Sequence, residues 1–242
     1  MNKNNKTKAI FITGTDTGVG KTIVAAGIAA AMRVRGANVG VMKPVHTGCR
    51  IIKGKMRPED SLLLARAASS DDPAEMITPY MFREPSAPYA AAKAHNMVID
   101  IGKITDCFNE ICRRHDYVIV EGIGGVLVPV TRDFYVADLI KRLNIPVVLV
   151  TRPDLGSINH TMLSIHCLKT KKTDLSGIII SNCKKGRGNF AEKTFQDSIE
   201  ALSGVPVLGT LPYLADLGFR LSSGTMKVPD LFFKVADALF DI

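Results

Sequence analysis

The chain has 242 residues, of which 46% are hydrophobic and 22% are charged. These proportions exclude a disordered, collagen-like or coiled-coil protein, and the length predicts one domain over residues 1–242. Lys and Arg number 31 against 23 Asp and Glu. The positive field attracts anions, but the basic residues are spread along the chain without interleaved aromatic residues, so we expect no nucleic-acid partner.

The cysteines are odd in number and show no CxxC spacing, which is typical of free thiols in a reducing compartment. They are Cys49, Cys107, Cys112, Cys167 and Cys183. No apolar stretch approaches 18 residues and no signal-peptide core is visible, so we expect a cytoplasmic protein with no membrane partner.

The first elements predict a parallel sheet. Residues 9–13 form a short apolar run that indicates a strand, and a glycine-rich segment follows over residues 14–20. Residues 21–35 have apolar side chains three and four apart, which predicts a helix, and residues 38–42 predict a second strand. A continuously apolar first strand in a β-loop-α-β order is typical of a parallel sheet with both faces covered.

Strands and helices continue to alternate along the rest of the chain. The middle, residues 46–96, is less regular, with a helical stretch at 60–68. Further strands are expected at 117–120, 146–150, 177–180 and 205–208, and further helices at 101–114, 157–168, 190–202 and 229–240. We therefore predict an α/β fold: a doubly wound, mostly parallel sheet flanked by helices, of the P-loop NTPase type.

The strongest chemical signal is the sequence Gly-Thr-Asp-Thr-Gly-Val-Gly-Lys-Thr over residues 14–22. It follows a strand and opens a helix, as a phosphate-binding loop must. Glycines let main-chain N–H groups surround phosphate oxygens, and the helix N-terminus adds partial positive charge. Lys21 would contact the β- and γ-phosphates and Thr22 would bind Mg²⁺. Five residues, rather than the common four, separate Gly14 from Gly20, so a simple glycine-rich turn is the competing interpretation.

Three further residues are candidates for the same site. Glu121 ends an apolar strand, where ligands gather in this fold class, and a carboxylate there suits Mg²⁺. Lys43 ends the second strand and could reach a reacting anion, although an ordinary exposed lysine would look the same. Asp60 alone is better explained as an acidic residue at a helix start. We interpret all histidines as structural or solvated: His46, His95, His115, His160 and His166.

These motifs together resemble the dethiobiotin synthetase family. The resemblance rests on the loop at 14–22, Lys-Pro-Val-x-Thr-Gly at 43–48, Asp60 at a helix start, Val-Glu-Gly-x-Gly-Gly at 120–125, Gly-Ser-Ile-Asn-His at 156–160, Ser-Asn-Cys at 181–183 and Leu-Pro-Tyr-Leu at 211–214. They occur in the family's order and cover most of the chain. The five-residue gap in the loop is the family's own form.

The resemblance implies an ATP-dependent cyclo-ligase. An amine of 7,8-diaminononanoate takes up CO₂ as a carbamate, ATP phosphorylates the carbamate, and the second amine closes the ring of dethiobiotin. Lys43 and Lys21 would be catalytic, and Thr47 and Asn159 would contact the diamine, Asn159 across a homodimer interface. Thr22, Asp60 and Glu121 would hold Mg²⁺. The implied ATP-binding residues are Gly18, Val19, Gly20, Lys21, Thr22, Ile23, Asp60, Glu121, Gly122, Ile123, Gly124, Asn182, Cys183, Pro212, Tyr213 and Leu214.

Two other functions compete with this one. A MinD/ParA-like nucleotide-switch ATPase would carry an extra lysine early in the loop, but residues 15–17 are Thr-Asp-Thr. A plain nucleotide-binding module would need neither Lys43 nor two metal-binding acids. Both alternatives therefore explain fewer of these residues.

Overall fold

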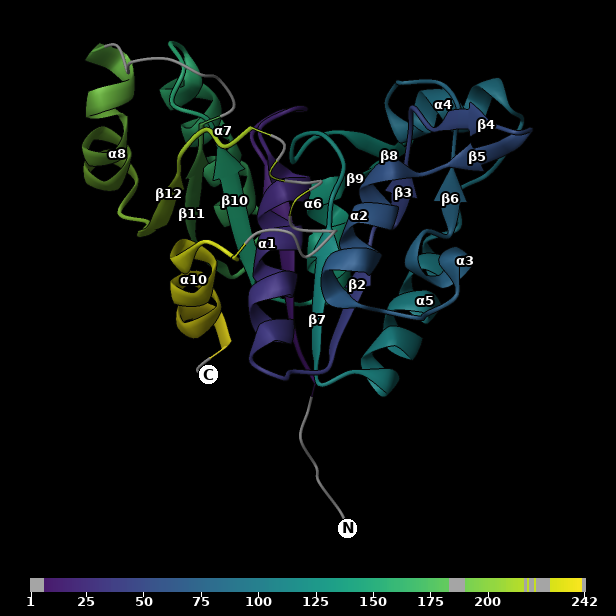
Figure 1. The fold of residues 1–242 in the computed structure, drawn as a ribbon. Coiled ribbons are helices and arrows are strands. Elements are labelled where there is room, and N and C mark those ends of the chain that lie inside the picture. Colours follow the sequence, from purple (N-terminus) through teal and green to yellow (C-terminus); the bar gives the residue numbers. More distant parts are fainter. Residues whose placement is uncertain (1–6, 183–189, 216, 218–219, 221–226, 241–242) are drawn as a thin grey trace.

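The computed structural model describes residues 7–182, 190–215, 217, 220 and 227–240. Its centre is a six-stranded sheet in the order β12-β11-β10-β1-β7-β2, in which each neighbouring pair is parallel (Figure 1). The strands are β1 (Lys8–Gly14), β2 (Val39–Met42), β7 (Tyr117–Glu121), β10 (Val147–Thr151), β11 (Leu175–Ser181) and β12 (Val207–Leu211). From β1 the chain crosses to the edge strand β2, returns to β7 beside β1, and then continues outward on the other side through β10, β11 and β12, which confirms the predicted doubly wound α/β fold.

Helices cover both faces of this sheet (Figure 1). Within the described residues they are α1 (Lys21–Val34), α2 (Glu59–Ala68), α3 (Ala74–Ile77), α4 (Pro88–Ala94), α5 (Ile101–Arg114), α6 (Val136–Leu143), α7 (Ser157–Thr170), α8 (Phe190–Ser203) and α10 (Asp230–Phe240). None of the helices in the described ranges is both long and apolar enough to cross a bilayer.

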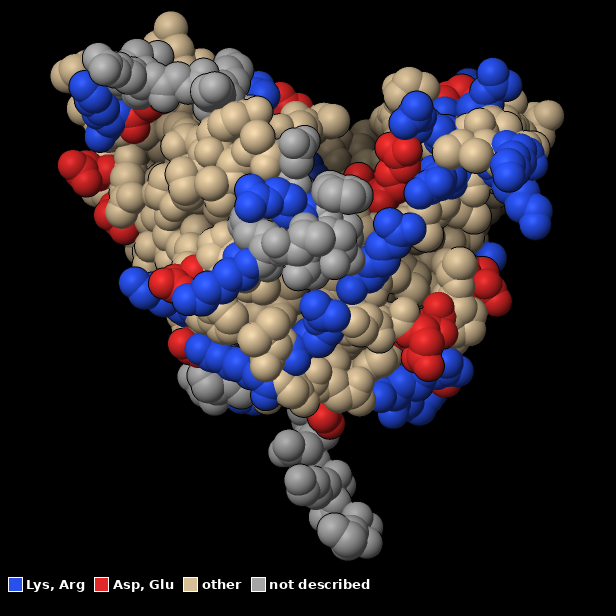
Figure 2. Space-filling view, viewed as in Figure 1, with Lys and Arg blue, Asp and Glu red and all other residues tan. Residues whose placement is uncertain are grey.

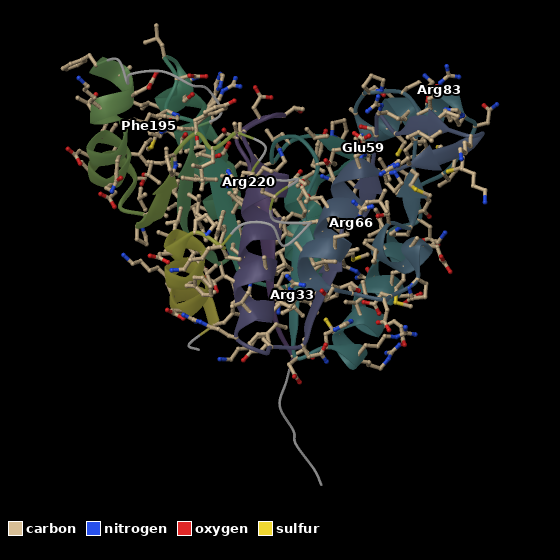
Figure 3. All side chains as sticks on the ribbon, viewed as in Figure 1. Arg33, Glu59, Arg66, Arg83, Phe195 and Arg220 are labelled. Carbon is tan, nitrogen blue, oxygen red and sulfur yellow. The ribbon has the colours of Figure 1, made fainter. Side chains whose placement is uncertain are left out.

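The two faces are built from alternate residues of the same strands. On β1, Ile10 and Ile12 pack in one cluster with α1, α2 and α10, while Ala9 and Phe11 pack in another with α5 and α6. A third cluster joins α7 and α8 to β10 and β11, and Phe195 of α8 contributes to it (Figure 3). Because successive side chains of a strand point to opposite faces, a strand covered on both sides must be apolar throughout, as β1 is.

Three small two-stranded sheets lie outside the central one. They are β3 (Val45–His46) with β6 (Tyr80–Met81), the hairpin β4 (Arg50–Ile52) with β5 (Lys55–Arg57), and β8 (Pro129–Thr131) with β9 (Phe134–Tyr135). The β3–β6 pairing is continued by main-chain hydrogen bonds from Phe82 to His46, Cys49 to Phe82 and Gly48 to Glu84. These bonds fix the segment that follows Lys43 against residues about 35 positions later in the chain.

The sequence-based boundaries hold for most of the predicted elements, and several short elements were not predicted. The expected helix at 101–114 is α5, and Asp100 caps it by accepting a hydrogen bond from the Gly102 N–H at 2.7 Å. The strand expected at 205–208 is wrong by about two residues, since β12 runs from Val207 to Leu211. Pro206 has no N–H to donate, and its carbonyl instead accepts from Ile178 at the strand entrance. The helices α3, α4 and α6 were not predicted, because their four to eight residues are too few for a clear helical period.

The close packing of α10 on α1 depends on a helix-interior glycine. A Cβ built on Gly27 would lie 2.3 Å from Cζ of Phe232, whose side chain is fully buried. The ring cannot move without opening the core, so the space at Gly27 is required by Phe232 and not by the helix itself.

We predict that Gly27→Ala destabilises the protein by about 1–3 kcal/mol through overpacking, despite the roughly 1 kcal/mol that alanine contributes to helix propensity. Urea unfolding measures the change. In a Phe232→Leu background the clash is relieved, and the same Gly27→Ala change should become neutral or stabilising. An equal loss of stability in both backgrounds would contradict this account of the interface.

Candidate functional site

The glycine-rich loop connects the end of β1 to the start of α1. Gly20 is the N-cap of α1, with a φ of 95° that a side chain would strain, and it provides no side-chain cap for the first turn of the helix. The first N–H groups of a helix have no partners within it, so this end of α1 is suited to an anion. At the other end of the loop, a Cβ on Gly14 would come 2.8 Å from Val19. The loop therefore needs glycine at both ends.

Lys21 folds back over this loop. Its Nζ donates a hydrogen bond of 2.7 Å to the main-chain oxygen of Asp16, and the residue is only 6% exposed. Burial, together with the nearby positive charge of Lys43, lowers the pKa of Lys21 from 10.5 to about 8. An anion placed in the loop would supply the opposite charge that this ammonium lacks.

A cluster of opposite charges stands beside the loop, in which Lys43 and Glu121 are buried and Asp60 is partly exposed. The Nζ atom of Lys43 lies 2.6 Å from Oε1 of Glu121 and 3.0 Å from Oδ2 of Asp60, and its third contact is the carbonyl oxygen of Gly122 at 3.3 Å. These contacts use the three donors of the ammonium. Lys43 follows β2, Glu121 ends β7 and Asp60 opens α2, so two adjacent strands and one helix position the cluster. Figure 3 labels Glu59, which stands next to Asp60 at the same end of α2.

The cluster sets the charge state of its members. Burial alone would lower the pKa of Lys43, but the charges of Glu121 and Asp60 outweigh it and raise that pKa. Burial alone would raise the pKa of Asp60, yet the charge of Lys43 outweighs it and lowers that pKa. Burial raises the pKa of Glu121 against the opposing effect of Lys43. Lys43 is thus held as an ammonium although it is 3% exposed.

The oxygen atoms of Glu121 and its neighbours are suitable ligands for a hard divalent cation. The Thr22 hydroxyl donates to Oε1 of Glu121 at 2.7 Å, and within the described residues Oε2 of Glu121 is buried without a hydrogen-bond partner. Such an orphaned carboxylate oxygen costs free energy unless a ligand satisfies it. The described residues contain no group of three His, Cys, Asp or Glu that could hold a metal alone. Mg²⁺ does not need one, because it usually keeps waters and takes phosphate oxygens as ligands.

A cavity of about 840 Å³ runs past the loop and the charged cluster. Figure 2 shows the surface hollowed at the upper edge, between the part of the molecule that carries α7 and α8 and the part that carries α4 and the β4–β5 hairpin. At its β12 end, the cavity is lined by Asn182 and residues 212–214. At its β3 end, it is lined by His46, Thr47 and residues 85–87.

Most of the residues predicted from the sequence meet in this cavity. Those that line it are Gly18, Gly20, Lys21, Thr22, Ile23, Lys43, Thr47, Asp60, Glu121, Ile123, Gly124, Asn182, Pro212, Tyr213 and Leu214. Val19 is fully buried behind the loop, and Gly122 contributes its carbonyl group to Lys43. Asn159 is exposed on α7 and does not line the cavity. Cys183 lies outside the described residues.

His46 was not among the residues that the sequence indicated for the site. We interpreted it as structural or solvated; it is 6% exposed, as a structural histidine would be, and it also lines the β3 end of the cavity. Burial lowers its pKa against the opposing charge of Asp60, which favours a neutral ring. Its position three residues after Lys43 was the only signal in the sequence. The residues at 85–87 gave no signal, because they reach the cavity through the pairing of β3 with β6.

Comparisons with known proteins give a consistent result. The AAA_26 family model, described as an AAA domain, matches residues 8–220. A protein of Thermodesulfovibrio yellowstonii named ATP-dependent dethiobiotin synthetase BioD is 42% identical over 86% of this chain and 89% of its own length. The protein of the same name from Bacillus velezensis is 43% identical over 86% of this chain and 87% of its own.

Solved structures with the same fold include switch ATPases. MinD from Pyrococcus horikoshii, in a complex with Mg-ADP, superposes with a TM-score of 0.65 at 16% identity and covers 97% of this chain and 96% of its own. A ParA family ATPase from Chlorobium tepidum superposes with a TM-score of 0.59 at 18% identity over 99% and 100% of the two chains. At these identities the likeness shows the fold alone.

The environment of Lys21 predicts how stability depends on pH. In the unfolded chain Lys21 stays charged up to about pH 10.5, but in the folded chain only up to about 8. Between pH 8 and pH 10.5 the unfolded chain binds more protons than the folded chain, so the contribution of Lys21 to the free energy of unfolding rises with pH. Below pH 8 the full destabilising effect of burying the Lys21 ammonium is present. Lys21→Met should therefore stabilise the unliganded protein at pH 7 by up to about 3 kcal/mol, with a smaller gain near pH 9.5. Urea unfolding of both proteins at the two pH values checks this, and an equal gain at both would contradict it.

Proposed function

The chain belongs to the family of ATP-dependent dethiobiotin synthetases, and from this we propose that it closes the ring of dethiobiotin from 7,8-diaminononanoate, CO₂ and ATP. The observation that carries the proposal is the position of Lys43. Its ammonium is buried and kept charged between Glu121 and Asp60, beside a phosphate-binding loop and between the two ends of one cavity. A simple nucleotide-binding module has no use for a buried cation at that point.

The nucleotide would occupy the loop and the β12 end of the cavity. Gly18, Gly20 and the first turn of α1 would surround the phosphates, and Lys21 would exchange its contact with the Asp16 carbonyl for phosphate oxygens. Asn182 and residues 212–214 follow β11 and β12, where they would contact the adenine. The proposed role of Cys183 in the same contact falls outside the described residues.

The reaction needs positioning and charge compensation more than a protein nucleophile. One amine of the diamine adds to CO₂ and loses a proton, which gives a carbamate. A carbamate oxygen attacks the γ-phosphorus, and ADP leaves. The second amine then attacks the carbamoyl carbon, the carbon–oxygen bond to phosphate breaks, and the amine's proton is released with phosphate. Lys43 and Lys21 would offset the negative charge on the carbamate and phosphoryl oxygens.

Mg²⁺ would be held by Thr22, Asp60 and Glu121, and it would give the orphaned Oε2 of Glu121 a partner. When bound, it would neutralise charge on the phosphate oxygens. Thr47, at the β3 end of the cavity, would contact the diamine.

We also propose that the protein is a cytoplasmic homodimer and that residues 1–242 form one domain. The exposed position of Asn159 on α7 fits a contact with the diamine's carboxylate bound to the partner subunit, because Asn159 does not line the cavity of its own chain. The cysteines among the described residues are free thiols, which fits a reducing compartment.

The direct test is to incubate the protein with ATP, Mg²⁺, bicarbonate and 7,8-diaminononanoate and to look for ADP and dethiobiotin by mass spectrometry. We expect both products in equal amounts, and no dethiobiotin when the diamine or bicarbonate is left out. ATP hydrolysis at the same rate with and without the diamine would instead support a nucleotide switch.

Lys43→Ala should reduce turnover by at least about 100-fold, because the reacting oxygens lose a preorganised positive charge. ATP affinity, measured by calorimetry, should stay within about threefold of the wild-type value and shows that the variant is folded. Lys55→Ala, at an exposed position on β5, is the matched control and should retain full activity. A Lys43→Ala enzyme with near-normal turnover would remove Lys43 from the mechanism.

A further inference from the structure

His46 is a buried imidazole in the wall of the cavity, at the one position that the Lys-Pro-Val-x-Thr-Gly motif leaves open. It ends β3, and its carbonyl oxygen accepts the 2.8 Å hydrogen bond from Phe82 that continues the β3–β6 pairing. The main chain is therefore fixed before His46, where Lys43 contacts its partners, and at His46 itself, where β3 pairs with β6. The ring is placed by the fold and is not a mobile surface side chain.

The two ring nitrogens have different surroundings. Nδ1 is buried and has no hydrogen-bond partner among the described residues. Nε2 also has no hydrogen-bond partner among the described residues, but unlike Nδ1 it is not fully buried. His46 lines the cavity, so Nε2 is the ring nitrogen that a ligand there can reach. A buried N–H without an acceptor costs more than a buried lone pair without a donor. The proton therefore belongs on Nε2, and His46 presents a neutral N–H donor to the cavity.

This donor faces the part of the cavity that the nucleotide does not use. The loop lies at the end of β1, the adenine contacts follow β11 and β12, and His46 lies on the other side of the loop with Thr47 and residues 85–87. Asp60 and Lys43 are the charged neighbours that act most strongly on its ring. His46 is thus next to the place where phosphoryl transfer from the loop would meet the second substrate.

We propose that His46 donates a hydrogen bond from Nε2 to a carbamate oxygen of the diamine substrate, and so recognises and orients the amine that has been carboxylated. This inference rests on the proposed function. A carbamate oxygen is an anionic acceptor, which makes the hydrogen bond stronger than one between neutral groups. The free amine is a poorer partner, because its lone pair must remain available to attack carbon.

The test compares two replacements of similar size, His46→Phe and His46→Gln. Phenylalanine fills the space but has no donor, whereas the glutamine amide keeps an N–H. We expect His46→Phe to lower kcat/KM for the diamine about 10- to 100-fold at saturating ATP, since a hydrogen bond to a charged group is lost. His46→Gln should stay within about fivefold of the wild type. ATP affinity should change by less than about twofold in both variants, because His46 does not contact the nucleotide.

His166→Phe, on the exposed face of α7 and away from the cavity, is the matched control and should behave as the wild type. Equal losses in the Phe and Gln variants would overturn the donor role, as would unchanged diamine kinetics in His46→Phe. A parallel loss of ATP affinity would show that His46 only supports the fold, and would also overturn it. A wild-type protein that makes no dethiobiotin overturns the proposed function and this inference together, whereas an active wild type with an unaffected His46→Phe overturns this inference alone.

Discussion

The burial of the Lys43 ammonium between two carboxylates constrains the rest of the site. Removing a charge from water costs several kcal/mol unless partners of the opposite sign stand at hydrogen-bond distance. The Nζ atom of Lys43 lies 2.6 Å from a carboxylate oxygen of Glu121 in β7 and 3.0 Å from one of Asp60 in α2. The cluster therefore forms only when β2, β7 and α2 are in their final places, so the fold and the charged site depend on each other.

The same arrangement divides the cavity. In the sheet order β12-β11-β10-β1-β7-β2, the loop after β1 stands between the ends of β11 and β12 on one side and the ends of β7 and β2 on the other. In parallel sheets ligands bind beyond the carboxyl ends of the strands. In the proposed function, a nucleotide whose phosphates fill the loop would have one side of the cavity for its base, and its terminal phosphate would point to the side that holds Lys43, Thr47 and His46.

How far the sequence predicts this protein depends on whether a signal is local. The apolar run of β1, the glycines of the loop and the helical period of α5 are local, and each was predicted close to its final bounds. Asp60 was indistinguishable from a helix-start residue until the resemblance to a family suggested otherwise. The place of His46 in the cavity wall was not predicted, because β3 is paired with β6, which lies about 35 residues further along the chain and carries no motif.

The structural likeness to MinD and ParA shows what the fold alone leaves open. A TM-score of 0.65 at 16% identity means that the sheet and its helices are shared, so neither can be the reason for a synthetase rather than a switch. The difference must lie in side chains that the fold tolerates but does not require. Lys43, kept charged beside the loop, and His46, at the β3 end, are such side chains, because both line the cavity and lie outside the strands of the central sheet. On this scaffold, a phosphoryl transfer from ATP to a small anion would therefore depend on the residues after β2 as well as on the loop.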